Sequence, residues 1–165
     1  MLILYFRMNV SILKGISFGF TSSIITALGM MVGIYVSTGS QIAVIGSIFL
    51  IAVADSLSDS LGIHISEESD KTKPHSQVWE STFATFLSKF FLTCTFLIPI
   101  FFLSLQDAII AGSIWGIIIL SALSYFIAKT KKENPAQVIG EHLLIATIVI
   151  IASYFIGVWV AATFN

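Results

Sequence analysis

Long apolar runs separated by short polar segments dominate this chain. Residues 15–54 contain no charged residue, and the polar run Ser37–Ser40 divides this stretch in two. A bilayer core needs about 20 apolar residues per helix, so each half is long enough for one span. Polar segments at 66–80, 106–107 and 129–135 separate three more apolar runs. The pattern predicts five membrane-spanning helices, at about residues 15–36, 42–65, 82–105, 108–128 and 138–164.

The composition supports this pattern. Of the 165 residues, 56% are hydrophobic and 10% are charged, and the mean hydropathy is +0.97. An ordinary soluble domain has about 25% charged residues, so a soluble enzyme, a secreted disulfide scaffold and a disordered tail are excluded. A single cysteine, Cys94, cannot form an internal disulfide. The net charge of −1, with no basic patch, argues against nucleic-acid binding. We expect a single-domain, all-α integral membrane protein over residues 1–165.

The distribution of basic residues predicts the orientation of the spans. With five spans, the N-terminus and the segments after the second and fourth spans share one side. These segments and their flanks hold all the Lys and Arg residues of the chain: Arg7, Lys14, Lys71, Lys73, Lys89, Lys129, Lys131 and Lys132. Basic residues concentrate in cytoplasmic loops, so we expect a cytoplasmic N-terminus and a non-cytoplasmic C-terminus.

The first 14 residues differ from a cleavable signal peptide. Arg7 and Lys14 flank an apolar stretch that is too short for a signal peptide, and no small-residue cleavage site follows it. We expect residues 1–14 to form a short amphipathic segment at the membrane surface. A compact chain without a targeting tail indicates a multi-pass protein of a prokaryotic cell membrane.

Two acidic residues inside the second predicted span are the main functional signal. Asp55 lies about 20 Å along that helix, and Asp59 follows on the same face. Charged groups at this depth are costly and usually functional. Two nearby carboxylates repel each other unless they share a proton or a cation, and carboxylate and hydroxyl oxygens suit Mn²⁺, Fe²⁺ or Mg²⁺. The predicted metal or proton path comprises Asp55, Asp59, Ser58, Ser22 and Thr26. The alternative is that each Asp caps a kink or pairs with Lys89 across helices.

Small residues form a stripe along the first predicted span. Its members are Gly15, Gly19, Ser22, Thr26, Gly29 and Gly33. Such a stripe lets another helix approach closely. It therefore predicts either plain helix packing or a dimer contact, and it places two hydroxyls where they could line a path.

Acidic residues also gather between the second and third spans, at Glu67, Glu68, Asp70, His75 and Glu80. They could collect cations from the cytoplasm. They are equally typical of a solvated loop, and Lys71 and Lys73 lie among them.

The order of these features resembles the vacuolar iron transporter family. The matching pieces are GFTSSIITALGMMVGI in the first span, ADSLSDSLGIHIS in the second, ATFLSKFFLTCTFLIPIFF in the third and ASYFIGVWV in the fifth. The resemblance implies a homodimer of five-helix protomers that meet through the first span. It also implies export of Fe²⁺ or Mn²⁺ from the cytoplasm, generally in exchange for protons, along a path lined by the first two spans.

The chain departs from this family at its metal ligands. Ser22 and Ser23 stand where the family carries Asp and Gly, Asp59 stands where it carries Met, and Ile63 where it carries Glu. The family's long, Glu-rich cytoplasmic region is reduced here to about 15 residues. The resemblance therefore implies a divergent, minimal member whose acidic site lies in the second span.

Two other functions compete with transport. The pair Asp55 and Asp59 resembles half of the metal site of CDP-alcohol phosphotransferases, but the required second acidic pair and Arg on an earlier helix are missing from residues 15–36. A non-transporting membrane subunit or sensor is the other alternative, although the short loops offer little docking surface. We expect a transporter rather than an enzyme, with a divalent cation as its substrate and no cofactor.

Overall fold

The computed structural model of the chain describes residues 10–164 and folds them into helices joined by short turns. In chain order the elements are α2 (Val10–Thr38), α3 (Gln41–Leu50), the π-helical turn η1 (Ile51–Asp55), α4 (Ser56–Glu68), α5 (His75–Thr95), α6 (Leu97–Phe102), α7 (Leu105–Lys131) and α8 (Pro135–Phe164).

Five helical stretches within residues 10–164 are long and apolar enough to cross a membrane. Three of them are α2, α7 and α8, and the other two are the continuous stretches Gln41–Glu68 and His75–Phe102. These five apolar helices confirm the predicted all-α class with five spans and agree with a multi-pass membrane protein. Most of these helices extend beyond the predicted spans, whereas the third ends at Phe102, before the predicted residue 105.

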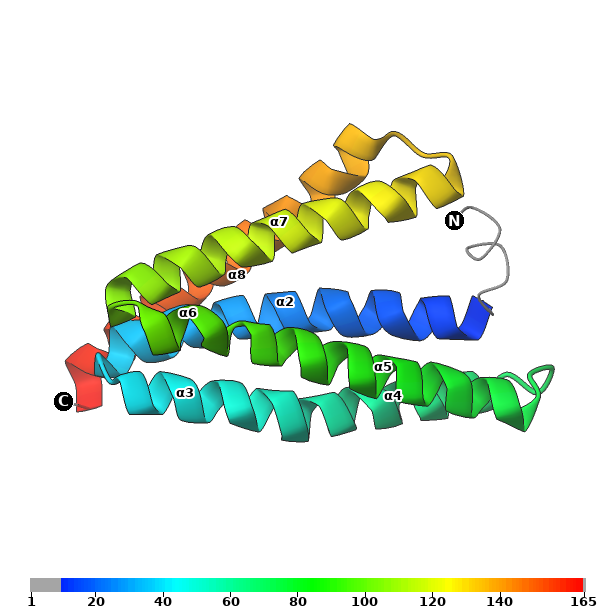
Figure 1. The fold of residues 1–165 in the computed structure, drawn as a ribbon, viewed down its shortest axis with the longest axis horizontal. Coiled ribbons are helices and arrows are strands. Elements are labelled where there is room, and N and C mark those ends of the chain that lie inside the picture. The colour runs from blue at the N-terminus through cyan, green and yellow to red at the C-terminus, as the bar shows by residue number, and fades with distance from the viewer. Residues whose placement is uncertain (1–9, 165) are drawn as a thin grey trace.

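Helix α2 lies at the centre of the bundle. It packs against α5 on one side and α8 on another, while α4 packs against α5 and α7 packs against α8 (Figure 1). The buried core collects around Ile24, Leu28 and Met31 of α2, with Ile48 of α3 and Phe96 beside them. Large apolar side chains also cover much of the outer surface, which suits contact with lipid chains.

Two predicted connections were placed wrongly. The expected loop at 66–80 is confined to residues 69–74, because α4 continues to Glu68 and α5 begins directly after Pro74. Proline favours the start of a helix because it lacks the N–H group that is unpaired there anyway. The expected turn at Gln106 and Asp107 is the first turn of α7 instead. Ser104 caps this helix by accepting a hydrogen bond from the Asp107 amide.

Two irregular turns interrupt the second and third spans. The turn η1 widens the helix just before α4, and Asp55 is its last residue. The third span breaks at Phe96, between α5 and α6. Pro99 accounts for this second break, since its ring clashes with the carbonyl four residues earlier and it donates no helical hydrogen bond.

Most of the basic residues lie at one end of the bundle. That end holds the start of α2, the α4–α5 loop and the α7–α8 loop, and the other end holds the α2–α3 and α6–α7 connections (Figure 1). Lys89 is different, because it lies within α5 and its side chain is buried. Of the predicted surface segment 1–14, residues 10–14 belong to α2, and the rest, including Arg7, lies outside the described residues.

Candidate functional site

Three helices bring four polar side chains together at the buried face of α4. Asp55 ends η1, Asp59 lies in the first turn of α4, Ser22 comes from α2 and Lys89 from α5. We refer to Ser22, Asp55, Asp59 and Lys89 as the polar cluster. The structure therefore shows the pairing with Lys89 that was the alternative to a cation path.

The Lys89 ammonium lies at the centre of the polar cluster. Its Nζ atom is 2.5 Å from Asp59 Oδ2, 2.6 Å from Asp55 Oδ2 and 2.9 Å from Ser22 Oγ. The Lys89 side chain is 0% exposed, whereas the side chains of Asp55 and Asp59 are 36% and 22% exposed. A fully buried ammonium needs such partners, because burying an unpaired charge costs several kcal/mol.

The two carboxylates are bound differently. Asp59 Oδ2 accepts hydrogen bonds from both Lys89 Nζ and Ser22 Oγ, each at 2.5 Å. Asp55 Oδ2 is close enough to Lys89 for an ion pair, but the angles do not fit a hydrogen bond. Neither Asp55 Oδ2 nor the buried Ser56 Oγ has a hydrogen-bond partner among residues 10–164. Of the two carboxylates, Asp55 therefore has the less complete set of hydrogen-bond partners.

A glycine in α2 makes this arrangement possible. A Cβ atom at Gly19 would meet Ser88 Oγ, and it would lie 2.7 Å from the Thr85 carbonyl oxygen and 3.2 Å from the Lys89 amide nitrogen. Both distances are shorter than ordinary van der Waals contacts. Without a side chain at Gly19, α2 can approach α5 closely enough for Ser22 to reach Lys89.

The glycines of the predicted stripe pack inside one chain. Gly15 and Gly19 lie against α5, while Gly29 and Gly33 face Ser153 of α8. Helix packing is therefore the role that the structure gives Gly15 and Gly19, whereas Gly29 and Gly33 are half-buried and line a groove between α2 and α8.

Two of the predicted path residues lie away from the polar cluster. Ser58 is exposed on α4, and Thr26 lines a separate groove between α2 and α8. Ser22, Asp55 and Asp59 are the members of the predicted path that the structure brings together.

The acidic residues predicted to form one loop between the second and third spans lie in three different places. Glu67 is buried at the end of α4 and pairs with Lys14 and Lys73, whereas Glu68 is exposed. His75 begins α5, and Glu80 lies one turn further along it. Asp70 remains in the loop, where hydrogen bonds from the Thr72 hydroxyl and amide hold the pKa of its carboxyl below the ordinary value of 3.8. The expected loop cluster is thus an ion-paired helix end next to a short turn.

Sequence reasoning missed two histidine contacts between neighbouring helices. His64 Nδ1 lies 2.9 Å from Thr82 Oγ1, and the His64 ring meets the Trp79 ring edge-on. His142 Nδ1 lies 2.7 Å from Ser124 Oγ and links α7 to α8. A polar residue within an apolar span signals such a contact, but its partner depends on how the helices pack.

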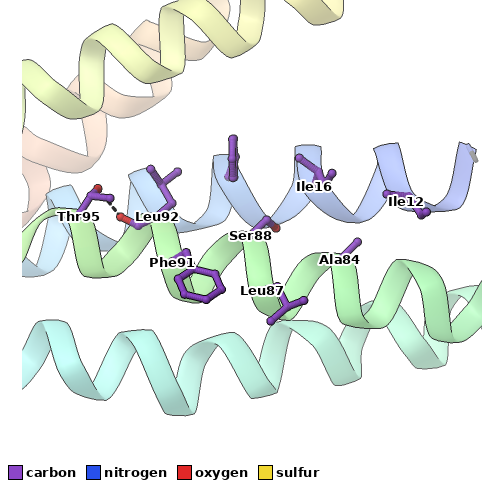
Figure 2. Close-up of a pocket in the computed structure, with 9 residues that line it drawn as sticks. Ile12, Ile16, Ala84, Leu87, Ser88, Phe91, Leu92 and Thr95 are labelled. Carbon is purple, nitrogen blue, oxygen red and sulfur yellow. Dashed lines mark hydrogen bonds between the residues drawn. The ribbon is translucent and has the colours of Figure 1, made fainter. Parts of the chain in front are cut away.

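One groove on the described surface lies apart from this chemistry. Figure 2 shows this groove of about 530 Å³ between α2 and α5, where Ile16, Leu87 and Phe91 line it. Its polar side chains are Ser88 and Thr95. A lining without charge suits lipid chains better than an ionic substrate.

The polar cluster can hold one cationic group among three oxygen atoms. Lys89 supplies that group in this structure. Among residues 10–164, no three His, Cys, Asp or Glu side chains gather in a way that could hold a metal ion. A metal bound here would therefore combine the two carboxylates with hydroxyl oxygens.

Comparisons of the chain with protein-family models, curated proteins and solved structures found no match. The resemblance to the vacuolar iron transporter family thus stays a prediction from the sequence.

Proposed function

We propose that this protein is a membrane transporter of a divalent transition-metal cation, Fe²⁺ or Mn²⁺, with Asp55 and Asp59 as its binding carboxylates. The observation that carries the proposal is the arrangement of Asp55 Oδ2, Asp59 Oδ2 and Ser22 Oγ around a single positive group, Lys89 Nζ. Paired acids at this position in an apolar helix are energetically costly, and charged residues kept in such helices usually have a function.

The proposed binding step exchanges one cation for another. A divalent ion between Asp55 and Asp59 balances their two negative charges, and the Ser22 hydroxyl adds an oxygen ligand. The Lys89 ammonium has to leave these oxygens when the metal binds, since two cations cannot share them in a medium of low dielectric constant. When the metal departs, the carboxylates take up positive charge again, either from Lys89 or from protons.

The basic end of the bundle supports the proposed orientation in the membrane, and the direction of transport is the one that the resemblance implies. Lys14, Lys71, Lys73, Lys129, Lys131 and Lys132 lie at the helix ends and loops of that side. The positive-inside rule places this end in the cytoplasm and the C-terminus on the other side. We propose export from the cytoplasm in exchange for protons, in the cell membrane of a prokaryote.

A homodimer remains part of the proposal, but we now propose a different helix as its contact surface. We expected dimerisation through the first span, but two of its four glycines, Gly15 and Gly19, already pack against α5 within the chain. The exposed face of η1 and α4 offers small residues at every fourth position, at Ala54, Ser58, Gly62 and Ser66. Close helix pairing there would also cover the exposed parts of Asp55 and Asp59.

The competing function is that of a non-transporting subunit or sensor, in which the polar cluster only holds α2, α4 and α5 together. The satisfied contacts of Lys89 and Asp59 favour this alternative. For an enzyme of the CDP-alcohol phosphotransferase type, the polar cluster supplies one acidic pair and no Arg. Transport measurements separate the first two functions directly.

The experiment is Mn²⁺ uptake into proteoliposomes containing the purified full chain, with a pH gradient imposed. Asp59→Asn should reduce uptake at least tenfold, because it removes one of the two binding charges. Asp107→Asn is the matched control, since Asp107 is an exposed residue of the first turn of α7 and lies outside the polar cluster. Both variants are checked for folding by size-exclusion chromatography and circular dichroism. Undiminished uptake by folded Asp59→Asn would exclude the proposed site, and no uptake by the wild-type chain would favour the non-transporting alternative.

A further inference from the structure

A second groove lies between the start of α2 and the end of α7, at the basic end of the bundle. Its volume is about 400 Å³, and its walls are formed largely by Leu13, Leu123, Phe126 and Ile127. Lys14 and Lys131 also line it. Figure 1 shows that α2 and α7 diverge toward this end, which accounts for the space between them. We refer to this space as the α2–α7 groove.

The charge at this end of the α2–α7 groove is positive. The last residues of α7 and the α7–α8 connection, residues 129–134, carry three lysines and one acidic residue, Glu133. Lys131 is exposed and belongs to none of the ion pairs found within residues 10–164. Lys14 pairs with Glu67, but its side chain is 50% exposed and an ammonium has three N–H donors. Both lysines can therefore donate to an anion bound beside the groove.

This combination fits an amphiphile with one anionic group and a long apolar tail. An apolar slot between membrane helices, ending in lysines at the cytoplasmic surface, has the chemistry of a site for anionic phospholipid. The phosphate would accept charge-assisted hydrogen bonds from the lysines, and an acyl chain would lie against Leu13, Leu123 and Phe126.

Charge complementarity favours a lipid over the chain's own N-terminus. Residues 1–9 adjoin Val10, which lines the groove, and their sequence MLILYFRMN is apolar. This segment carries Arg7 and no acidic residue, so it would add positive charge beside Lys14 and Lys131.

We propose that the α2–α7 groove binds one anionic phospholipid, with its phosphate on Lys14 and Lys131 and an acyl chain between the two helices. The proposal depends on the membrane location of the protein and is independent of cation transport. Metal binding by Asp55 and Asp59 has no bearing on whether the groove binds a lipid.

The test is native mass spectrometry of the full chain, purified in detergent and incubated with phosphatidylglycerol or phosphatidylcholine of identical acyl chains. We expect retention of phosphatidylglycerol over phosphatidylcholine. Each lysine near the phosphate contributes about a fivefold increase in binding, so Lys131→Gln should lower retention of phosphatidylglycerol by about this factor. Lys71→Gln removes the same charge from the α4–α5 loop, away from the groove, and should leave retention unchanged. Equal retention of both lipids, or equal losses in the two variants, would overturn the proposal.

A second variant and a labelling experiment test the acyl-chain position. Leu123→Trp fills the apolar part of the groove without changing any charge, and it should also lower retention of phosphatidylglycerol. A phosphatidylglycerol with a photoreactive acyl chain should label peptides containing residues 13–17 and 123–127. Labelling confined to other helices would show that the groove holds something else, such as residues 1–9, and would refute the proposal.

Discussion

Removing the Lys89 ammonium is the perturbation whose outcome the structure predicts most sharply. Lys89→Met keeps an unbranched apolar stem of similar length and deletes the ammonium group at the centre of the polar cluster. Asp55 and Asp59 then face each other without a counter-ion in a partly buried position.

The expected magnitude follows from the contacts. Lys89 donates hydrogen bonds to Asp59 and Ser22, and hydrogen bonds to charged groups are each worth about 1.5–3 kcal/mol. Breaking a buried ion pair by removing one partner costs about 3–5 kcal/mol. Because both carboxylates are partly exposed, the free energy of unfolding should fall by about 3 kcal/mol, the lower end of that range.

The assay is SDS-induced unfolding in mixed micelles, followed by tryptophan fluorescence and helical circular dichroism. Lys71→Met is the control, since Lys71 is exposed in the α4–α5 loop, and its effect should stay within about 0.5 kcal/mol. The double variant Lys89→Met with Asp59→Asn completes a thermodynamic cycle. Its destabilisation should be smaller than the sum of the single effects by about 1–3 kcal/mol.

Two results would refute this reasoning. If Lys89→Met unfolds at the same SDS fraction as the wild-type chain, the ammonium does not stabilise the bundle. If the two single effects add without interaction, Lys89 and Asp59 act independently and the short distance between them has no energetic consequence.

Three further predictions concern other parts of the bundle. Gly19→Ala should destabilise the protein by about 1–3 kcal/mol in the same assay, because its Cβ would meet the α5 backbone, whereas Gly46→Ala, with open space around it, should be neutral or slightly stabilising. Glu67→Gln should cost about 1–3 kcal/mol through its lost contacts with Lys14 and Lys73, and a loss as small as that of Glu68→Gln would contradict this role. The Asp70 carboxyl should titrate below 3.8 in a carbon-detected NMR experiment, and Thr72→Val should move its midpoint upward. Since the pKa of Asp70 is lowered on folding, its contribution to stability is present above pH 3.8 and is lost as the pH falls through the lowered value.

Hydropathy predicted the number of apolar helices well, but it did not predict where each helix begins and ends. Hydropathy reports the length of an apolar stretch, but a helix continues into polar residues as long as its backbone hydrogen bonds are formed. This is why α4 includes Glu67 and Glu68, and why α7 starts at Leu105. The signals that fix these ends are local caps such as Ser104 and Pro74, and the hydropathy pattern does not contain them.

The candidate site was predicted in part. Asp55, Asp59 and the possible partner Lys89 were visible as charges in apolar segments, and such charges need partners wherever they occur. Ser22 was placed on the right face of its helix, but Thr26 and Ser58, which seemed equivalent in spacing, lie elsewhere. Spacing along one helix shows which residues share a face without showing which helix covers that face.

The sequence by itself therefore determined the class of the protein, its five apolar helices and the two acids that the apolar segments have to accommodate. These features depend on composition and on helical periodicity, which are local. Tertiary structure decided that one ammonium forms ion pairs with both acids and that α5 approaches α2 closely at Gly19. It also decided that Glu67 pairs with Lys14 and Lys73 instead of facing solvent. Ser22 contacts Asp59 and Lys89, which lie 37 and 67 positions further along the sequence. Only the packing of α2, α4 and α5 brings such distant residues together.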